Sequence, residues 1–137
     1  MTLESTPQPV PDSLSVLLVD DDQHTCNVFQ VVMDHFHIPL TIAQNAETAL
    51  TYLSHNTPDV IVMDIFLPGI DGYQALYQIR KHALAPTSAV IATTAYYTAD
   101  TQKDVLAWGF SGYLPKPLNP STLIPYLREV WQRSKSG

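Results

Sequence analysis

Short apolar runs alternate with helical patterns along almost the whole chain, and this alternation constrains the fold more than any other feature. The runs contain four to six residues, and the first, third and fourth are rich in Val and Ile, as expected of strands that are covered on both faces. They lie at Ser15–Val19, Leu40–Ala43, Asp59–Asp64, Ser88–Thr93 and Ser111–Leu114. Five strands, each followed by a helix, predict an α/β fold in which one parallel sheet lies between two layers of helices.

The helical segments also carry start and stop signals. Residues 24–36 have Val28, Val31 or Val32, and Phe36 at helical spacing, which predicts the buried face of the first helix. Further helices are predicted from caps and from apolar periodicity. The signals are Asn45 before Ala46, Ala49, Leu50 and Leu53; Asp71 before Leu76 and Ile79; Gly109 after Thr98–Trp108; and Asn119-Pro120 before Leu123, Leu127, Val130 and Trp131.

Composition limits the function classes. The 137 residues suit one domain, and a net charge of −6 argues against nucleic-acid binding through a basic surface. No apolar run reaches the length of a membrane span, and the first residues do not resemble a signal peptide. The single Cys26 cannot form an internal disulfide, so we expect a cytoplasmic protein. We predict an N-terminal tail at residues 1–12, a domain over 13–133 and a C-terminal tail at 134–137.

Polar side chains gather where the predicted strands end. Asp20, Asp21 and Asp22 follow the first strand, Asp64 ends the third, Thr93 and Thr94 the fourth, and Lys116 follows the fifth. Parallel sheets bind ligands at this edge, and carboxylates from neighbouring strands repel unless a cation lies between them. Oxygen ligands suit Mg²⁺, with Mn²⁺ as the alternative ion. A lysine and a hydroxyl beside the metal favour a phosphoryl site with a carboxylate nucleophile.

Four motifs, taken together, resemble the receiver domain of the two-component response regulator family. They are "VLLVDDD", "VIVMDIFLPGIDGY", "VIATTA" and "GYLPKPL", and the resemblance covers the chain from about residue 13 to 133. It implies a doubly wound, flavodoxin-like (βα)5 fold with strand order 2-1-3-4-5, an order that the alternation alone does not give.

The resemblance implies a role for each matching residue. Asp64 matches the phospho-accepting aspartate, and Asp21 a direct Mg²⁺ ligand. The backbone carbonyl of Phe66 matches a further ligand, and Asp20 a carboxylate that holds the ion through water. Asp22 is interpreted as a helix N-cap and not as a main ligand.

The same resemblance implies a conformational switch. Thr94 matches the switch hydroxyl, Lys116 the lysine that contacts the phosphoryl group, and Tyr113 an aromatic residue that changes position on activation. The Lys116–Pro117 bond is expected to be cis. Thr93 is interpreted as strand-end structure.

In this reading Asp64 takes a phosphoryl group from a phosphohistidine of a sensor histidine kinase or a histidine phosphotransfer protein. The chain is then no enzyme beyond self-directed phosphoryl transfer and slow autodephosphorylation. The face formed by Thr98–Trp108, Ser111–Leu114 and the last helix is expected to contact a downstream protein, and it is a candidate for pairing two copies. A phosphorelay intermediate remains an alternative, as does a receiver cut from a longer protein. Nucleic acid and membrane are not expected partners.

Several aromatic residues remain open to more than one interpretation. Phe66 and Tyr96 are aromatic where small or polar groups are frequent in the family, and we expect them to flank the pocket and to screen Asp64 from water. Tyr96 with Tyr97 could instead contact a partner. Trp108 and Trp131 are predicted to be core or interface anchors. The histidines are interpreted as surface or helix-end residues.

Two other classes with related architecture fit poorly. A haloacid-dehalogenase phosphatase places its nucleophile after the first strand and usually carries a cap domain. A flavodoxin-type FMN carrier needs a phosphate-binding loop after the first strand, where three aspartates would repel the phosphate.

Overall fold

The strands form one parallel sheet at the centre of the molecule. The computed structural model describes residues 14–136, so the predicted tail at residues 1–12 lies outside the described residues. The strands are β1 (Val16–Val19), β2 (Leu40–Ala43), β3 (Val60–Asp64), β4 (Ala89–Thr94) and β5 (Gly112–Pro115). Their order is β2-β1-β3-β4-β5, as the family resemblance implied.

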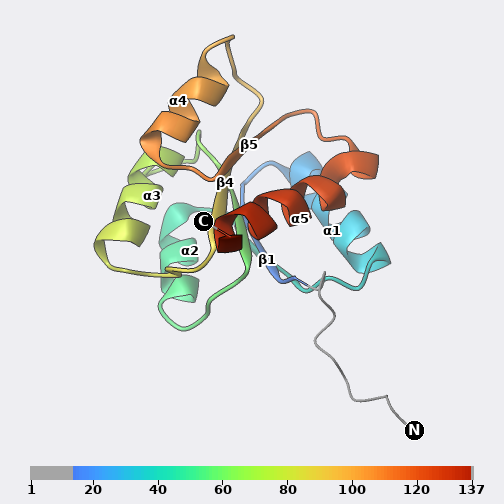
Figure 1. Cartoon of the computed structure of the whole chain (residues 1–137), viewed down its shortest axis with the longest axis horizontal. Helices are drawn as coiled ribbons and strands as arrows, with labels where there is room; N and C mark the ends of the chain where they lie inside the picture. The colour runs from blue at the N-terminus through green and yellow to red at the C-terminus, as the bar shows by residue number, and fades with distance from the viewer. Residues whose placement is uncertain (1–13, 137) are drawn as a thin grey trace, which may run out of the picture.

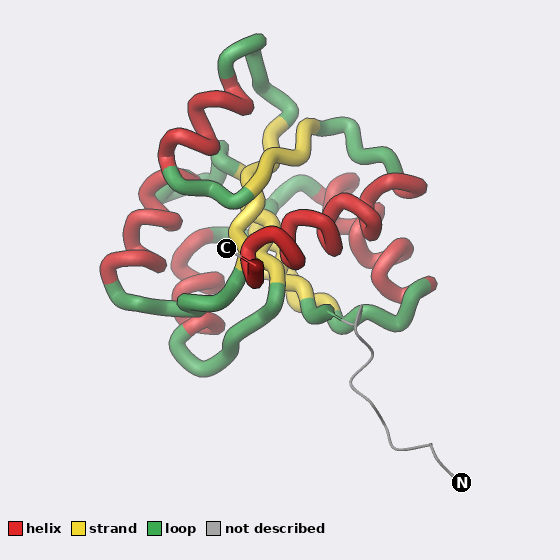
Figure 2. Tube along the Cα trace, viewed as in Figure 1, coloured by secondary structure: helices red, strands yellow, loops and turns green. Residues whose placement is uncertain are grey.

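Two layers of helices cover the sheet (Figures 1 and 2). The helices are α1 (Gln23–His35), α2 (Ala46–Leu53), α3 (Gly72–Lys81), α4 (Thr101–Trp108) and α5 (Pro120–Ser136). Helices α1 and α5 lie on one face, and α2, α3 and α4 on the other. Within residues 14–136 no helix combines the length and the apolar composition that crossing a membrane requires.

Alternate residues of each central strand enter different cores. Leu17 and Val19 of β1 pack under α2 and α3, whereas Val16 and Leu18 pack under α1 and α5. Every residue of β1, β3 and β4 is buried, which confirms strands covered on both faces. This arrangement brings the carboxyl ends of neighbouring strands to one edge.

The buried face of α1 agrees with the prediction only in part, because Val32 is buried and Val28 packs against the core, but the other predicted positions are exposed. Val31 is 70% exposed and Phe36 is 51% exposed, while Phe29 is fully buried. The helix ends at His35 and Phe36 caps it, with its ring against the His35 ring, so Phe36 lies beyond the buried stripe. The face that meets the sheet consists of Thr25, Cys26, Phe29, Val32 and Met33.

Helices α4 and α5 also depart from the predicted boundaries. Helix α4 begins at Thr101 and not at Thr98, and among its residues only Val105 is buried. Helix α5 continues to Ser136, so residues 134–136 are helical where a tail was predicted. The ammonium of Lys135 lies 4.4 Å from the centre of the Trp131 ring, a cation–π contact that supports this last turn.

Candidate functional site

The carboxylates predicted to form the site meet at the carboxyl edge of the sheet. Asp20 directly follows β1 and Asp64 ends β3, and these strands are neighbours. One oxygen each from Asp20, Asp21 and Asp64 lies within 4.8 Å of the others. Asp20 is fully buried and Asp64 nearly so, whereas Asp21 is exposed. The cluster therefore has a buried floor and an open side.

Lys116 directly follows the edge strand β5, and its side chain reaches this cluster. Its Nζ lies 2.9 Å from Oδ2 of Asp20 and 3.2 Å from Oδ2 of Asp64. The backbone N–H of Lys116 donates to the carbonyl of Thr94, and the Lys116–Pro117 bond is cis. Burial lowers the pKa of Lys116, but the hydrogen bond and charge of Asp20, with the charge of Asp64, outweigh it and raise the pKa overall.

Backbone N–H groups hold the carboxylates in place. The N–H of Asp22 donates to Oδ1 of Asp20, and the N–H of Phe66 donates to Oδ1 of Asp64, both at 2.9 Å. Gly72 lets α3 begin directly beneath Asp64, because a Cβ there would lie 2.7 Å from the Asp64 carbonyl oxygen. The free oxygens of Asp20 and Asp64 are thereby directed toward Lys116.

The charges and the oxygen ligands fit a divalent cation. Three carboxylates face one ammonium, which leaves an excess of two negative charges. Burial raises the pKa of Asp20, although the hydrogen bonds from Asp22 and Lys116 oppose that rise. Oδ2 of Asp20 is buried, and its one close polar partner among the described residues is the Lys116 ammonium at 2.9 Å. Hard oxygen ligands with this excess of charge suit Mg²⁺.

The two threonines at the end of β4 are used differently. The hydroxyl of Thr93 donates to the Leu114 carbonyl at 2.6 Å, which ties β4 to β5. This contact agrees with the strand-end interpretation of Thr93. The hydroxyl of Thr94 accepts the N–H of Tyr96 at 2.9 Å and so ties the start of the β4–α4 loop to the strand.

Tyr113 lies half-buried on β5, and its hydroxyl has no hydrogen-bond partner in the described part of the chain. Burial, followed by the charge of Tyr97, raises the pKa of Tyr113. Its backbone N–H, at the free edge of the sheet, donates to the Tyr126 hydroxyl of α5 at 2.8 Å. Nothing in the sequence marks Tyr126 for this role, because no local pattern links a helical tyrosine to a strand thirteen residues earlier.

The rings of Phe66 and Tyr96 contact each other edge to face beside the site. Their ring centres are 5.8 Å apart and their planes are nearly perpendicular, the edge-to-face arrangement that aromatic rings favour. Phe66 is 55% exposed and Tyr96 is 76% exposed. Both line a hollow of about 420 Å³ that also contains Asp64 and Lys116.

The remaining polar candidates take no direct part in the cluster. Asp22 accepts the N–H and the hydroxyl of Thr25, so it caps α1 as predicted. Cys26 is buried, and its thiol donates to the Asp20 carbonyl. All five histidines are exposed, which agrees with their surface interpretation.

The fold and the site together define a class: a doubly wound α/β domain with an acidic pocket and a paired lysine at the carboxyl edge of its sheet. The family model described as the response regulator receiver domain matches residues 16–128, and the chain belongs to this family. Receiver domains are signalling domains of two-component systems, and phosphorylation and Mg²⁺ binding are typical of them.

Relatives and solved structures agree with this assignment. An uncharacterized 14.6 kDa protein of Leptolyngbya boryana is 31% identical, over 85% of this chain and 88% of its own length. A response regulator of Synechocystis is 29% identical over 92% of this chain, which spans 55% of that relative. A Francisella response regulator receiver domain superposes with a TM-score of 0.79 at 28% identity, covering 89% of this chain and 99% of that one.

Proposed function

We propose that Asp64 accepts a phosphoryl group from a phosphohistidine of a sensor histidine kinase or histidine phosphotransfer protein. The observation that carries this proposal is the position of Asp64, whose Oδ2 lies 3.2 Å from Lys116 in a cluster with Asp20 and Asp21. We further propose that a divalent cation is held by Asp21, Asp64 and the Phe66 carbonyl, with Asp20 acting through water. A bound Mg²⁺ supplies charge neutralisation for the phosphoryl oxygens.

The chain's own residues would perform the transfer as follows. A carboxylate oxygen of Asp64 attacks phosphorus, the phosphorus–nitrogen bond breaks, and the electron pair of that bond returns to the partner's imidazole. The product is an acyl phosphate on Asp64. Lys116, whose raised pKa keeps it charged, is positioned to stabilise the added negative charge.

The switch would begin at Thr94. Its hydroxyl accepts the Tyr96 N–H and donates to the Tyr96 carbonyl at 3.3 Å, and a phosphoryl oxygen on Asp64 would compete with that carbonyl for the hydroxyl proton. Moving Thr94 pulls on the β4–α4 loop and makes room beside Tyr113. The face of α4, β5 and α5 would then change and contact a downstream protein or a second copy.

Chemical phosphorylation tests the central claim. The full chain is incubated with acetyl phosphate and Mg²⁺, and the products are separated on a phosphate-affinity gel. Wild type is expected to give a slower band that Asp64→Asn lacks and that EDTA prevents. The Asp71→Asn variant is a matched control, since it alters an aspartate that caps α3 and lies outside the acidic cluster. Absence of the band in wild type would overturn the proposal.

A phosphorelay intermediate is the second candidate. It would return its phosphoryl group to a histidine phosphotransfer protein within the lifetime of the acyl phosphate. Mixing purified phosphorylated chain with such a partner separates the two roles: label that moves to the histidine supports the relay, and label that stays on Asp64 supports signalling by contact.

The aromatic pair offers a finer proposal about this lifetime. We propose that the paired Phe66 and Tyr96 rings screen the acyl phosphate from attacking water. Phe66→Asn with Tyr96→Glu should shorten the lifetime about tenfold, as timed by loss of phosphate. Tyr97→Glu is the control, because this substitution adds a neighbouring negative charge while leaving the Phe66–Tyr96 pair intact. An unchanged lifetime in the double variant would exclude screening.

A further inference from the structure

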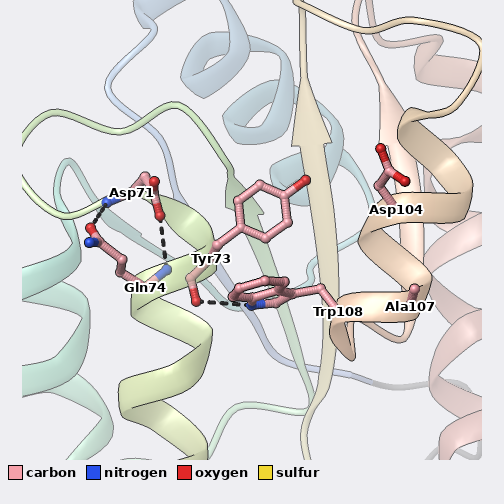
Figure 3. A pocket seen from close by; sticks show the side chains of 6 residues that line it. All are labelled: Asp71, Tyr73, Gln74, Asp104, Ala107 and Trp108. Atoms are coloured by element: carbon pink, nitrogen blue, oxygen red, sulfur yellow. Dashed lines mark hydrogen bonds between the residues drawn. The ribbon is translucent and has the colours of Figure 1, made fainter.

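A groove between α3 and α4 has features that the phosphoryl site does not use (Figure 3). It has a volume of about 560 Å³ and is lined by Asp71, Tyr73 and Gln74 on one side and Asp104, Ala107 and Trp108 on the other. We propose that this α3–α4 groove is a docking site for an amphipathic helix of a partner protein, with basic residues beside its apolar face. It differs from the face of α4, β5 and α5 considered above.

Trp108 is the anchor of this groove. Its side chain is 57% exposed, yet its indole N–H donates to the Tyr73 carbonyl at 3.3 Å and the two rings lie 5.1 Å apart, edge to face. Tyr73 in turn packs edge to face against Phe110. The exposed aromatic surface is therefore already ordered, so a partner would lose little side-chain entropy here on binding. Tryptophan and tyrosine in such positions dominate the energetics of many interfaces.

The apolar surface continues beyond Trp108. A second hollow of about 360 Å³ shares Ala107 and Trp108 with the first and adds Leu76, Tyr77, Gly109 and Arg80. Arg80 stands near the C-terminal end of α3, at the opposite end of that helix from Asp71. Tyr77 is itself largely exposed. The small side chains of Ala107 and Gly109 leave room for a partner backbone to approach. A strip of this kind between two helices is the surface into which an amphipathic helix lays its apolar face.

Charge decides which helix would fit. Asp71 and Asp104 stand on opposite walls of the groove (Figure 3), and within residues 14–136 neither forms an ion pair. Burial raises the pKa of Tyr73, and the negative charges of Asp104 and Asp71 raise it further. Both carboxylates therefore act on the Tyr73 ring in the groove. A Lys or Arg on the partner would be attracted to this rim. A second copy of a chain with a net charge of −6 would be repelled.

Peptide selection tests the docking site without relying on phosphorylation. A phage-displayed library of random helix-forming peptides is selected against the unmodified full chain. Selected peptides should carry Lys or Arg beside aromatic or aliphatic residues at helical spacing. Trp108→Ala should weaken their binding at least about tenfold, as measured by fluorescence anisotropy.

Two matched variants make the result specific. Asp71→Asn with Asp104→Asn keeps the cap of α3, because Asn caps as well as Asp, and should weaken binding about fivefold with a smaller salt dependence. Val31→Ala removes an apolar residue of α1 that is even more exposed than Trp108, on the opposite face of the sheet, and should leave binding unchanged. Circular dichroism and the reaction with acetyl phosphate check that each variant is folded.

Other outcomes overturn the proposal. Peptides that are acidic, that bind Trp108→Ala as tightly as wild type, or that fail to be selected would show that the groove is not such a site. Sedimentation that shows a dimer dissociated by Trp108→Ala would assign the groove to a second copy.

Discussion

Helices α4 and α5 lie on opposite faces of the same sheet and are held to it very differently. Helix α5 buries Leu123, Leu127 and Val130, and its Trp131 is only 7% exposed. Helix α4 buries Val105 alone, and its Trp108 is 57% exposed. The start of α4 is weak as well, because the Asp100 side chain makes no capping hydrogen bond, whereas Asp22, Asn45 and Asp71 cap α1, α2 and α3.

This contrast shows which part of the molecule can move at low cost. Shifting α5 would expose a large apolar surface, at roughly 25 cal/mol for each Å². Shifting α4 would disturb one buried residue, and α4 follows the loop that Thr94 ties to the phosphoryl site. A weakly held helix beside the site is suited to transmit a local chemical change.

Replacing the two tryptophans should show the largest difference in packing between α4 and α5. Trp131→Ala removes a buried side chain and should lower the free energy of unfolding by about 3–5 kcal/mol. Trp108→Ala should lower it by less than about 1 kcal/mol, because most of that side chain is already in water. Urea denaturation measures both. Equal losses would mean that α4 is packed as firmly as α5.

Hydrogen exchange sharpens the comparison residue by residue. Amides of α4 should open locally and exchange with protection at least about tenfold lower than amides of α5, which should approach the global limit. NMR-detected exchange on the unphosphorylated chain measures this. Matching protection in both helices would contradict a loosely held α4.

The helix caps give the smallest expected effect. Asp22→Ala should cost about 1 kcal/mol because it leaves the Thr25 N–H without its acceptor, while Asp100→Ala should cost only a few tenths. Urea denaturation in EDTA keeps metal binding out of the comparison. A similar loss of unfolding free energy in both variants would contradict the claim that α1 is capped more strongly than α4.

The Asp22 cap of α1 predicts a dependence of stability on pH with a definite sign. The hydroxyl and the N–H of Thr25 lower the pKa of Asp22 below its ordinary value of 3.8. The charged cap therefore stabilises the folded state above that value, and the stabilisation is lost as pH falls through the lower folded pKa. Asp22→Asn should consequently lose less stability than wild type on acidification from neutral pH. The exposure of Asp22 keeps this difference small.

Much of the fold was predictable because its signals are local. Short, mainly apolar runs predicted all five strands to within one residue at either end, and Asn45, Asp71 and Gly109 marked helix ends correctly. The face of α1 was predicted only in part, because several valines offered competing stripes and Phe36 lies beyond the end of the helix. Only packing against the sheet selected the stripe that contains Phe29.

The site divides in the same way. The residues at the strand ends were identifiable, since a parallel sheet brings them to one edge. The contact of Lys116 with Asp20, the stacking of Phe66 on Tyr96 and the bond from Tyr113 to Tyr126 were not. Each of these depends on side-chain directions set by distant segments.

The sequence by itself thus determined the alternation of strands and helices, the acidic edge of the sheet and the family, because periodicity and motif order are encoded in neighbouring residues. Only the tertiary structure decided which carboxylate oxygens share Lys116, and that Trp131 is buried while Trp108 is exposed. Those outcomes depend on long-range packing, in which residues far apart in the chain compete for the same space and the same charge.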